Sequence, residues 1–179
     1  MKRHLLPLFL VILLLCPACG RQPAEEPENT KPPISEAMKQ ARAQSRLLYA
    51  AFGYDEDGNP LYPEEFSGTY YGEDELLHIL IVNGTEPGCY DHIVDANYVQ
   101  YETARNSLNA LCALKASLWE AVETLGFRGI SINQKANVVV LDIPDAECID
   151  PLAAALDQRG IDREMYTIEV AITEYPILE

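Results

Sequence analysis

One run of seven residues, 76–82, constrains the fold more than any other part of this sequence. It reads LLHILIV, so apolar side chains occupy both its odd and its even positions. Neighbouring side chains of a strand point to opposite faces, and this run therefore predicts a central strand that is covered on both sides. Residues 66–71 precede it across the polar turn 72–75, which predicts a β-hairpin. The chain must build at least one sheet between packed layers.

Helical periodicity predicts three helices around such a sheet. The first covers residues 34–52 and has its basic residues off the apolar stripe. The second, over residues 103–125, has the longest apolar stripe, which includes Cys112, and it ends at Gly126. The third is short and begins near Pro151, since proline suits the first turn of a helix.

Alternating side chains and turn residues predict further strands. Residues 130–133 and 138–143 form a second hairpin, 98–101 a short strand, and 166–173 a strand with one polar face. After the first hairpin the order is strand, helix, strand, strand, helix, strand, with no visible internal repeat. We therefore predict an α+β fold with helices packed on one face of a mostly antiparallel sheet.

Changes in composition along the chain predict its domain organisation. Residues 1–18 form a signal peptide, 34–60 an amphipathic helix and a turn, and 61–179 the α+β domain. The intervening residues 19–33 read CGRQPAEEPENTKPP, with four prolines and no aliphatic side chain larger than alanine. Such a segment cannot bury enough apolar surface to fold, so we expect a disordered tether.

The first residues are typical of an export signal. Lys2 and Arg3 precede the apolar run 5–15, which is far shorter than the ~20 residues that span a bilayer as a helix. The following Ala18-Cys19-Gly20 resembles the lipobox of bacterial lipoproteins. The resemblance implies cleavage before Cys19 and diacylglycerol on its sulfur, and two acyl chains suffice for stable anchoring. An ordinary secretion signal with incidental cysteines is the alternative interpretation.

The net charge restricts the partners. The chain contains 13 Lys+Arg and 28 Asp+Glu, a formal net charge of −15. Loss of residues 1–18 removes two basic residues and no acidic ones, which brings the net charge to −17. So acidic a chain cannot neutralise a row of phosphates or hold anionic lipid, and we expect no nucleic-acid partner. Its charge favours a basic protein or peptide, and membrane contact would come from the diacylglycerol on Cys19.

Three cysteines follow the lipidation site: Cys89, Cys112 and Cys148. Outside the cytoplasm one pair could form a disulfide, and three pairings are conceivable. We favour Cys89 with Cys148, because both lie in connections. Cys112 lies on an apolar stripe, where a thiol packs as a small hydrophobe. The alternative leaves all three cysteines reduced.

The mature chain offers few groups for catalysis. Its histidines are His78, within the central apolar strand, and His92, and no Gly-x-Ser-x-Gly motif accompanies them. The densest cluster of metal-ligand residue types is Cys89, Asp91, His92 and Asp95, but its spacing matches no zinc motif. We therefore predict a protein that is not an enzyme, with no catalytic residue and no cofactor. The alternative is a metal-binding protein or metal-dependent enzyme that uses this cluster.

A longer stretch resembles a known class of region. It contains YPEEFSGTY at residues 62–70, the strand 76–82, Tyr101 with the helix after it, and the hairpin 129–140. Together these resemble the prodomain-like regions of bacterial secreted serine proteases of the alpha-lytic type. Such regions fold or inhibit a protease through surface contacts and have no catalytic residues. The resemblance therefore implies a binding module, or an inhibitor or chaperone-like partner of a secreted protease.

These features combine into one hypothesis. The chain is predicted to be a lipoprotein on the extracytoplasmic face of the cell membrane. Its non-catalytic α+β domain is predicted to bind another protein or peptide.

Overall fold

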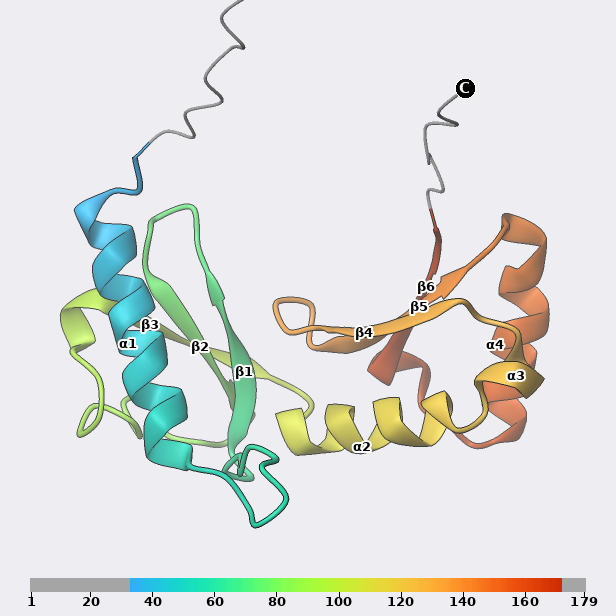
Figure 1. Cartoon of the computed structure of the whole chain (residues 1–179), viewed down its shortest axis with the longest axis horizontal. Coiled ribbons are helices and arrows are strands. Elements are labelled where there is room, and N and C mark those ends of the chain that lie inside the picture. The colour runs from blue at the N-terminus through green and yellow to red at the C-terminus, as the bar shows by residue number, and fades with distance from the viewer. Residues whose placement is uncertain (1–32, 172–179) are drawn as a thin grey trace, which may run out of the picture. The chain divides into compact units, whose positions relative to one another are not determined.

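The structure, a computed structural model, describes residues 33–171 (Figure 1). Its helices are α1 (Glu36–Phe52), α2 (Leu108–Trp119), α3 (Val122–Leu125) and α4 (Ile149–Gln158). Its strands are β1 (Phe66–Tyr71), β2 (Leu77–Val82), β3 (Val99–Ala104), β4 (Gly129–Asn133), β5 (Val138–Ile143) and β6 (Tyr166–Val170). Single 3₁₀ turns are η1 (Ala96–Tyr98), η2 (Ala146–Cys148) and η3 (Arg163–Met165).

The predicted signal peptide, the lipidation site Cys19 and the tether up to residue 32 lie outside the described residues. The described residues from Ile34 onwards belong to one compact unit. Among them, no helix is both long enough and apolar enough to cross a bilayer.

α1 forms where apolar residues recur at helical spacing after a capping serine. The Ser35 hydroxyl accepts a hydrogen bond from the Met38 backbone amide at 3.0 Å, which satisfies one of the unpaired amides of the first turn. Ala41, Gln44 and Leu48 are the buried residues of the helix and lie on one side of it. This side packs on β1 and β2.

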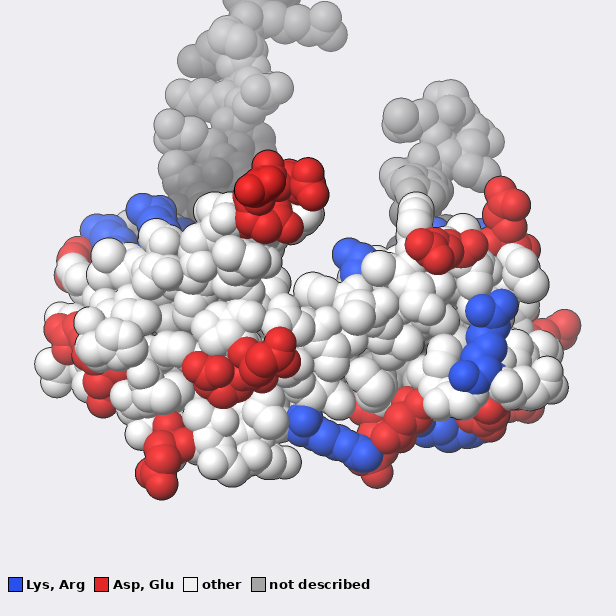
Figure 2. All heavy atoms as spheres, turned by 90° about the horizontal axis from the view of Figure 1, so that it is seen from below, with Lys and Arg blue, Asp and Glu red and all other residues white. Residues whose placement is uncertain are grey.

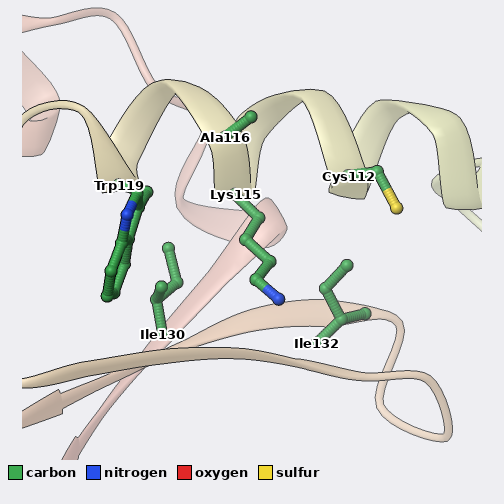
Figure 3. Close-up of a pocket in the computed structure, with 6 residues that line it drawn as sticks. All are labelled: Cys112, Lys115, Ala116, Trp119, Ile130 and Ile132. Carbon is green, nitrogen blue, oxygen red and sulfur yellow. The ribbon is translucent and has the colours of Figure 1, made fainter. Parts of the chain in front are cut away.

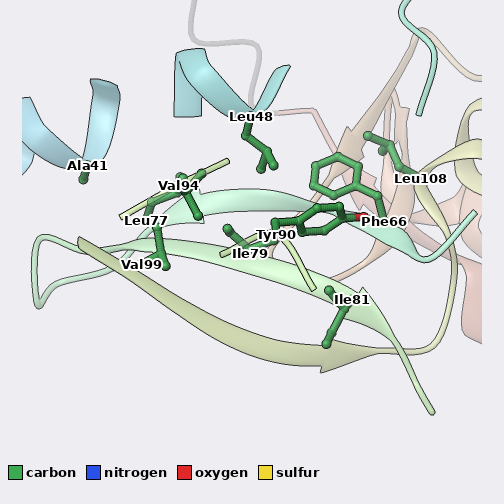
Figure 4. Close-up of a cluster of buried hydrophobic side chains, with 10 residues drawn as sticks. All are labelled: Ala41, Leu48, Phe66, Leu77, Ile79, Ile81, Tyr90, Val94, Val99 and Leu108. Atoms are coloured by element: carbon green, nitrogen blue, oxygen red, sulfur yellow. The ribbon is translucent and has the colours of Figure 1, made fainter. Parts of the chain in front are cut away.

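The first sheet has the strand order β1-β2-β3. β1 and β2 are antiparallel, whereas β3 follows a crossover and runs parallel to β2. As the run LLHILIV predicts, β2 is the central strand and is buried along nearly its whole length. Figure 4 shows the apolar cluster of this half, whose buried members are Ala41, Leu48, Phe66, Leu77, Ile79, Ile81, Tyr90, Val94, Val99 and Leu108.

The second sheet has the order β4-β5-β6, again with an antiparallel first pair and a parallel second pair. α2 and α4 pack on the same face of it, because leucines of both helices share one core with alternate residues of β5. The buried members of this core are Leu111, Leu118, Phe127, Val139, Leu141, Ile143, Leu152, Leu156 and Tyr166.

The two sheets repeat one topology, although the sequence shows no repeat. Each combines an antiparallel hairpin with a third strand that runs parallel to the second. Each third strand directly follows a 3₁₀ turn that is capped by an aspartate, Asp95 before η1 and Asp162 before η3. The similarity is hidden in the sequence because the first crossover is mostly irregular, whereas the second contains α4.

The predicted α+β class is confirmed, and two details of the prediction are corrected. Two mixed sheets replace the single, mostly antiparallel sheet, because a long connection precedes β3 and β6 and allows parallel pairing. The helix predicted over 103–125 begins later, since Thr103 and Ala104 pair within β3. Ser107 caps α2 instead, and its hydroxyl accepts from the Ala110 amide at 3.2 Å.

Hydrogen bonds join the two halves of the described chain. The Asn106 backbone amide donates to Asn137 Oδ1 at 2.7 Å, and Asn137 Nδ2 donates to the Asn106 carbonyl at 2.9 Å. The Thr69 backbone amide, on β1, donates to Gln134 Oε1 at 2.6 Å. The turn of the β4–β5 hairpin therefore holds both the outer edge of β1 and the end of β3.

Candidate functional site

A groove of about 490 Å³ lies between α2 and β4, shown in Figure 3. Lys115 and Trp119 extend from the helix toward the strand, while Ile130 and Ile132 of β4 point toward the helix. Trp119, the single tryptophan of the chain, is 56% exposed. The residues that line the groove are Cys112, Lys115, Ala116, Trp119, Ile130 and Ile132.

The periodicities of a helix and a strand build this groove. Cys112, Ala116 and Trp119 follow one another at i, i+4 and i+7, so they share one face of α2. Ile130 and Ile132 are two residues apart and share one face of β4. Leu111, Leu114 and Leu118 of α2 face the second core, so both the core side and the groove side of the helix are apolar. A helix that is apolar all round ordinarily packs against a neighbour on each side.

Cys112 is exposed rather than part of the core, which corrects the prediction for this residue. The apolar stripe expected over 103–125 places Cys112 inward. In the structure Leu111 and Leu118 form the buried side of α2, and Cys112 lies on another side of the helix. Partial burial in the groove raises the pKa of the Cys112 thiol. It therefore stays a neutral thiol at pH 7 and is a poor nucleophile.

A second cluster of polar residues surrounds His78 on β2. Glu102 Oε1 lies 2.6 Å from His78 Nδ1, and the two carboxylate oxygens of Asp74 lie 3.0 and 3.1 Å from Nε2. The histidine is only 6% exposed. Both ring nitrogens are therefore engaged by carboxylates, and neither is left to serve as a general base toward a bound substrate.

The carboxylates favour the charged form of His78. Burial alone lowers the pKa of the imidazole, but the hydrogen bonds with Asp74 and Glu102 outweigh it, and the pKa is raised. The same hydrogen bonds work in the other direction on the acids. Burial raises the pKa of Glu102, but hydrogen bonds from Tyr70 and His78 lower it overall, and His78 also lowers the pKa of Asp74. The cluster is best described as a structural ion network within the first sheet.

Tyr70 completes this network from β1. Its ring stacks on His78 with the centroids 4.5 Å apart, and its hydroxyl donates to Glu102 Oε1 at 2.8 Å. Burial, and then the neighbouring Glu102 carboxylate, raises the pKa of the tyrosine to about 12. Lys135 Nζ lies 5.1 Å from the centre of the Tyr70 ring, a cation–π contact from the β4–β5 turn. The network therefore links all three strands of the first sheet to the second half.

The residues proposed from the sequence as metal ligands do not converge. Asp91 accepts a hydrogen bond from the Tyr101 hydroxyl at 2.9 Å, and Asp95 caps η1 by accepting from the Asn97 amide at 3.0 Å. His92 is exposed, whereas Cys89 packs against the first core. Within residues 33–171, no group of three or more His, Cys, Asp and Glu side chains could hold a metal ion.

The cysteines of the described residues are all free, in place of the disulfide expected between Cys89 and Cys148. Cys89 packs against the first apolar core and Cys148 against the second. The sequence placed both in connections, but it could not show that the two connections cover different cores.

The groove was not predicted from the sequence. The signal that could have revealed it is the composition of α2, LNALCALKASLW, in which Lys115 is the only charged residue. A helix of this composition has few polar residues for an outer face, which indicates that apolar side chains also occupy its solvent side. Comparison with known proteins assigns no family, because no family model and no curated protein matches this chain.

Proposed function

We propose that this protein is a lipid-anchored, extracytoplasmic binding protein without catalytic activity. Its α+β domain binds a segment of another protein in the groove between α2 and β4. The observation that carries the proposal is the exposed Trp119 over an apolar floor made by Ile130 and Ile132. Tryptophan is enriched among the residues that contribute most of the free energy of binding at protein–protein interfaces.

The chemistry of the groove supports binding rather than catalysis. Its ionisable side chains are Lys115 and Cys112, and the raised pKa of Cys112 keeps that thiol neutral. The one buried histidine of the described chain is held on both sides by carboxylates. Neither place offers the pairing of nucleophile and base that covalent catalysis requires.

The acidic surface suits a protein partner that is basic overall. Figure 2 shows acidic and basic side chains interspersed on one face of the described residues. The excess of acid in the whole chain, a net charge of −15, would attract a basic partner over a distance of about 10 Å at ordinary salt. The groove itself would then provide the close apolar contact.

A random dodecapeptide phage library, selected against the immobilised lipidated protein, tests this proposal. We expect peptides that bind the unmodified protein and lose at least ten-fold in affinity to Ala116→Arg, which fills the groove from an exposed position. Ala113→Arg is the matched control, since Ala113 is exposed on α2 outside the groove. The proposal fails if no enriched peptide distinguishes Ala116→Arg from the unmodified protein.

A further inference from the structure

We infer that the groove binds an extended segment by strand addition to the outer edge of β4. The segment has two apolar side chains four residues apart and a carboxylate midway between them, so that all three face the groove. This inference rests on the proposed function and names the class of partner for the same site.

The edge of β4 is the least protected strand edge among the described residues. β4 is an outer strand and reads GISIN, with no charge and no proline. Of the other outer strands, β3 carries Glu102 and β6 carries the exposed Glu169. Proteins commonly protect strand edges from added strands with charges, bulges, prolines or covering segments, and none of these devices is present within β4.

β1, the equivalent strand of the first sheet, shows what a protected edge looks like in this fold. Its pairing with β2 is irregular between Phe66 and Gly68, which marks a bulge. Its outward Thr69 amide is occupied by Gln134 Oε1 at 2.6 Å. The two sheets share one topology, yet only the β1 edge is bulged and capped in this way.

The spacing of the groove floor fits a strand. Ile130 and Ile132 alternate with Ser131 along β4 and face α2. A strand added beside β4 would place every second side chain on this same face, opposite the two isoleucines and under Trp119. Main-chain hydrogen bonds would then provide affinity, and the apolar groove would select the alternate side chains.

Lys115 specifies the charge of the segment. It is the one charged residue that lines the groove, and it extends toward β4 between Trp119 and Cys112. A carboxylate on the middle of three groove-facing positions would meet its ammonium, with apolar neighbours on either side. A second copy of this chain is a poor occupant, because a net charge of −15 on each copy opposes association.

The probe that tests this inference is the peptide Ac-Thr-Val-Thr-Glu-Thr-Val-Thr-NH₂, titrated into the full lipidated protein. Because Trp119 is the single tryptophan, its fluorescence reports binding at the groove directly. We expect a saturable blue shift, with at least ten-fold tighter binding than an isomer whose valines are adjacent. Ala113→Arg should bind the peptide as the unmodified protein does.

Methylation of the peptide nitrogens distinguishes strand addition from other docking. Alternate residues of a strand direct their N–H groups to the same side. One peptide carries N-methyl groups on its Val and Glu residues, and a second carries them on its inner Thr residues. One of the two should therefore lose binding, and the other should keep an affinity within three-fold of the unmethylated peptide. Equal effects of the two methylations, or none from either, would overturn strand addition.

A charge exchange tests the role of Lys115. Lys115→Glu should weaken binding of the Glu peptide about five- to ten-fold, and a Lys peptide should recover most of the loss on this variant. Arg159→Glu, at the exposed end of α4, is the control for net charge. Absence of recovery would contradict the assigned carboxylate. If the library yields groove-dependent peptides but the alternating peptide does not bind, the inference fails and the proposed function stands.

Discussion

His78 lies between two carboxylates inside the first sheet, and this placement decides how the fold responds to pH. Its pKa is raised, so its contribution to stability is complete below the unfolded value of ~6.5 and is lost as pH rises through the folded value. The pKa values of Asp74 and Glu102 are lowered, so their contributions are present above ~4.5 and are lost as pH falls.

The free energy of unfolding should therefore peak between about pH 4.5 and 6.5 and decrease on both sides. Urea denaturation from pH 3 to 9 at constant ionic strength measures this profile. His78→Gln should flatten the decrease above pH 6, because glutamine cannot be protonated. Parallel profiles for the two proteins between pH 6 and 9 would show that His78 does not cause the decrease.

Removal of the His78 imidazole should lower the free energy of unfolding, because the ring is hydrogen-bonded on both sides. His78→Leu leaves the Glu102 and Asp74 carboxylates without their shared hydrogen-bond partner, and it removes the ring that stacks on Tyr70. We expect a loss of about 2 kcal/mol in the free energy of unfolding at pH 6. His92→Leu, at an exposed position, is the matched control and should change it by less than about 0.5 kcal/mol. Equal losses would contradict the assigned network.

Asn137 in the β4–β5 turn both adopts a left-handed backbone conformation and bonds to the other half of the chain. Asn137 is buried, has a positive φ of 56°, and exchanges two side-chain hydrogen bonds with the Asn106 backbone. Asn137→Ala leaves both backbone groups unpaired and adds strain, so we expect a loss of about 3 kcal/mol in the free energy of unfolding.

Two further variants separate these causes in thermal or urea unfolding. Asn137→Gly removes the strain and should recover about 1 kcal/mol of the loss. Asn133→Ala, in the same turn, removes only an exposed bond to the Ala136 amide and should cost about 1 kcal/mol or less. If Asn133→Ala lowers the free energy of unfolding as much as Asn137→Ala, the hydrogen bonds between Asn137 and Asn106 have no special role in stability.

Most helices and strands could be predicted from the sequence because their signals are local. The run at 76–82 and the alternation after Tyr166 each describe one strand, and the turn at 134–137 joins two strands that are adjacent in sequence. Strand pairing could not be predicted in the same way, because it depends on where a crossover returns the chain. The irregular crossover before β3 gives no local sign that this strand lies parallel to β2.

The candidate site was predictable only in part. Cys112, Ala116 and Trp119 belong to a strong helical pattern, but periodicity alone does not say which of two apolar faces becomes the core. The structure resolves this, because Leu111 and Leu118 pack inward and leave Trp119 outward. The polar residues at 89–95 are close together in the sequence, but they do not form a site. Asp91 and Asp95 instead accept hydrogen bonds from nearby residues of the same connection and strand.

For the whole molecule, the proposal requires the domain to be held at a membrane through Cys19. Cys19→Ser removes the sulfur that would carry diacylglycerol, and with it both acyl chains. We expect the variant to appear in the medium or to stay unprocessed, as measured by fractionation and immunoblotting. Ala18→Gly keeps a small residue before the cysteine and should stay in the membrane fraction. Unchanged membrane retention of Cys19→Ser would contradict lipid anchoring.

The central claim is that this protein binds an extended segment along β4 and α2. Amide hydrogen exchange of the full protein, with and without a saturating concentration of the alternating Val-Thr-Glu-Thr-Val peptide, tests it most directly. We expect slower exchange confined to β4 and the outer face of α2, including Ile130, Ile132 and Trp119. Protection elsewhere, with β4 amides unchanged at saturation, would contradict it.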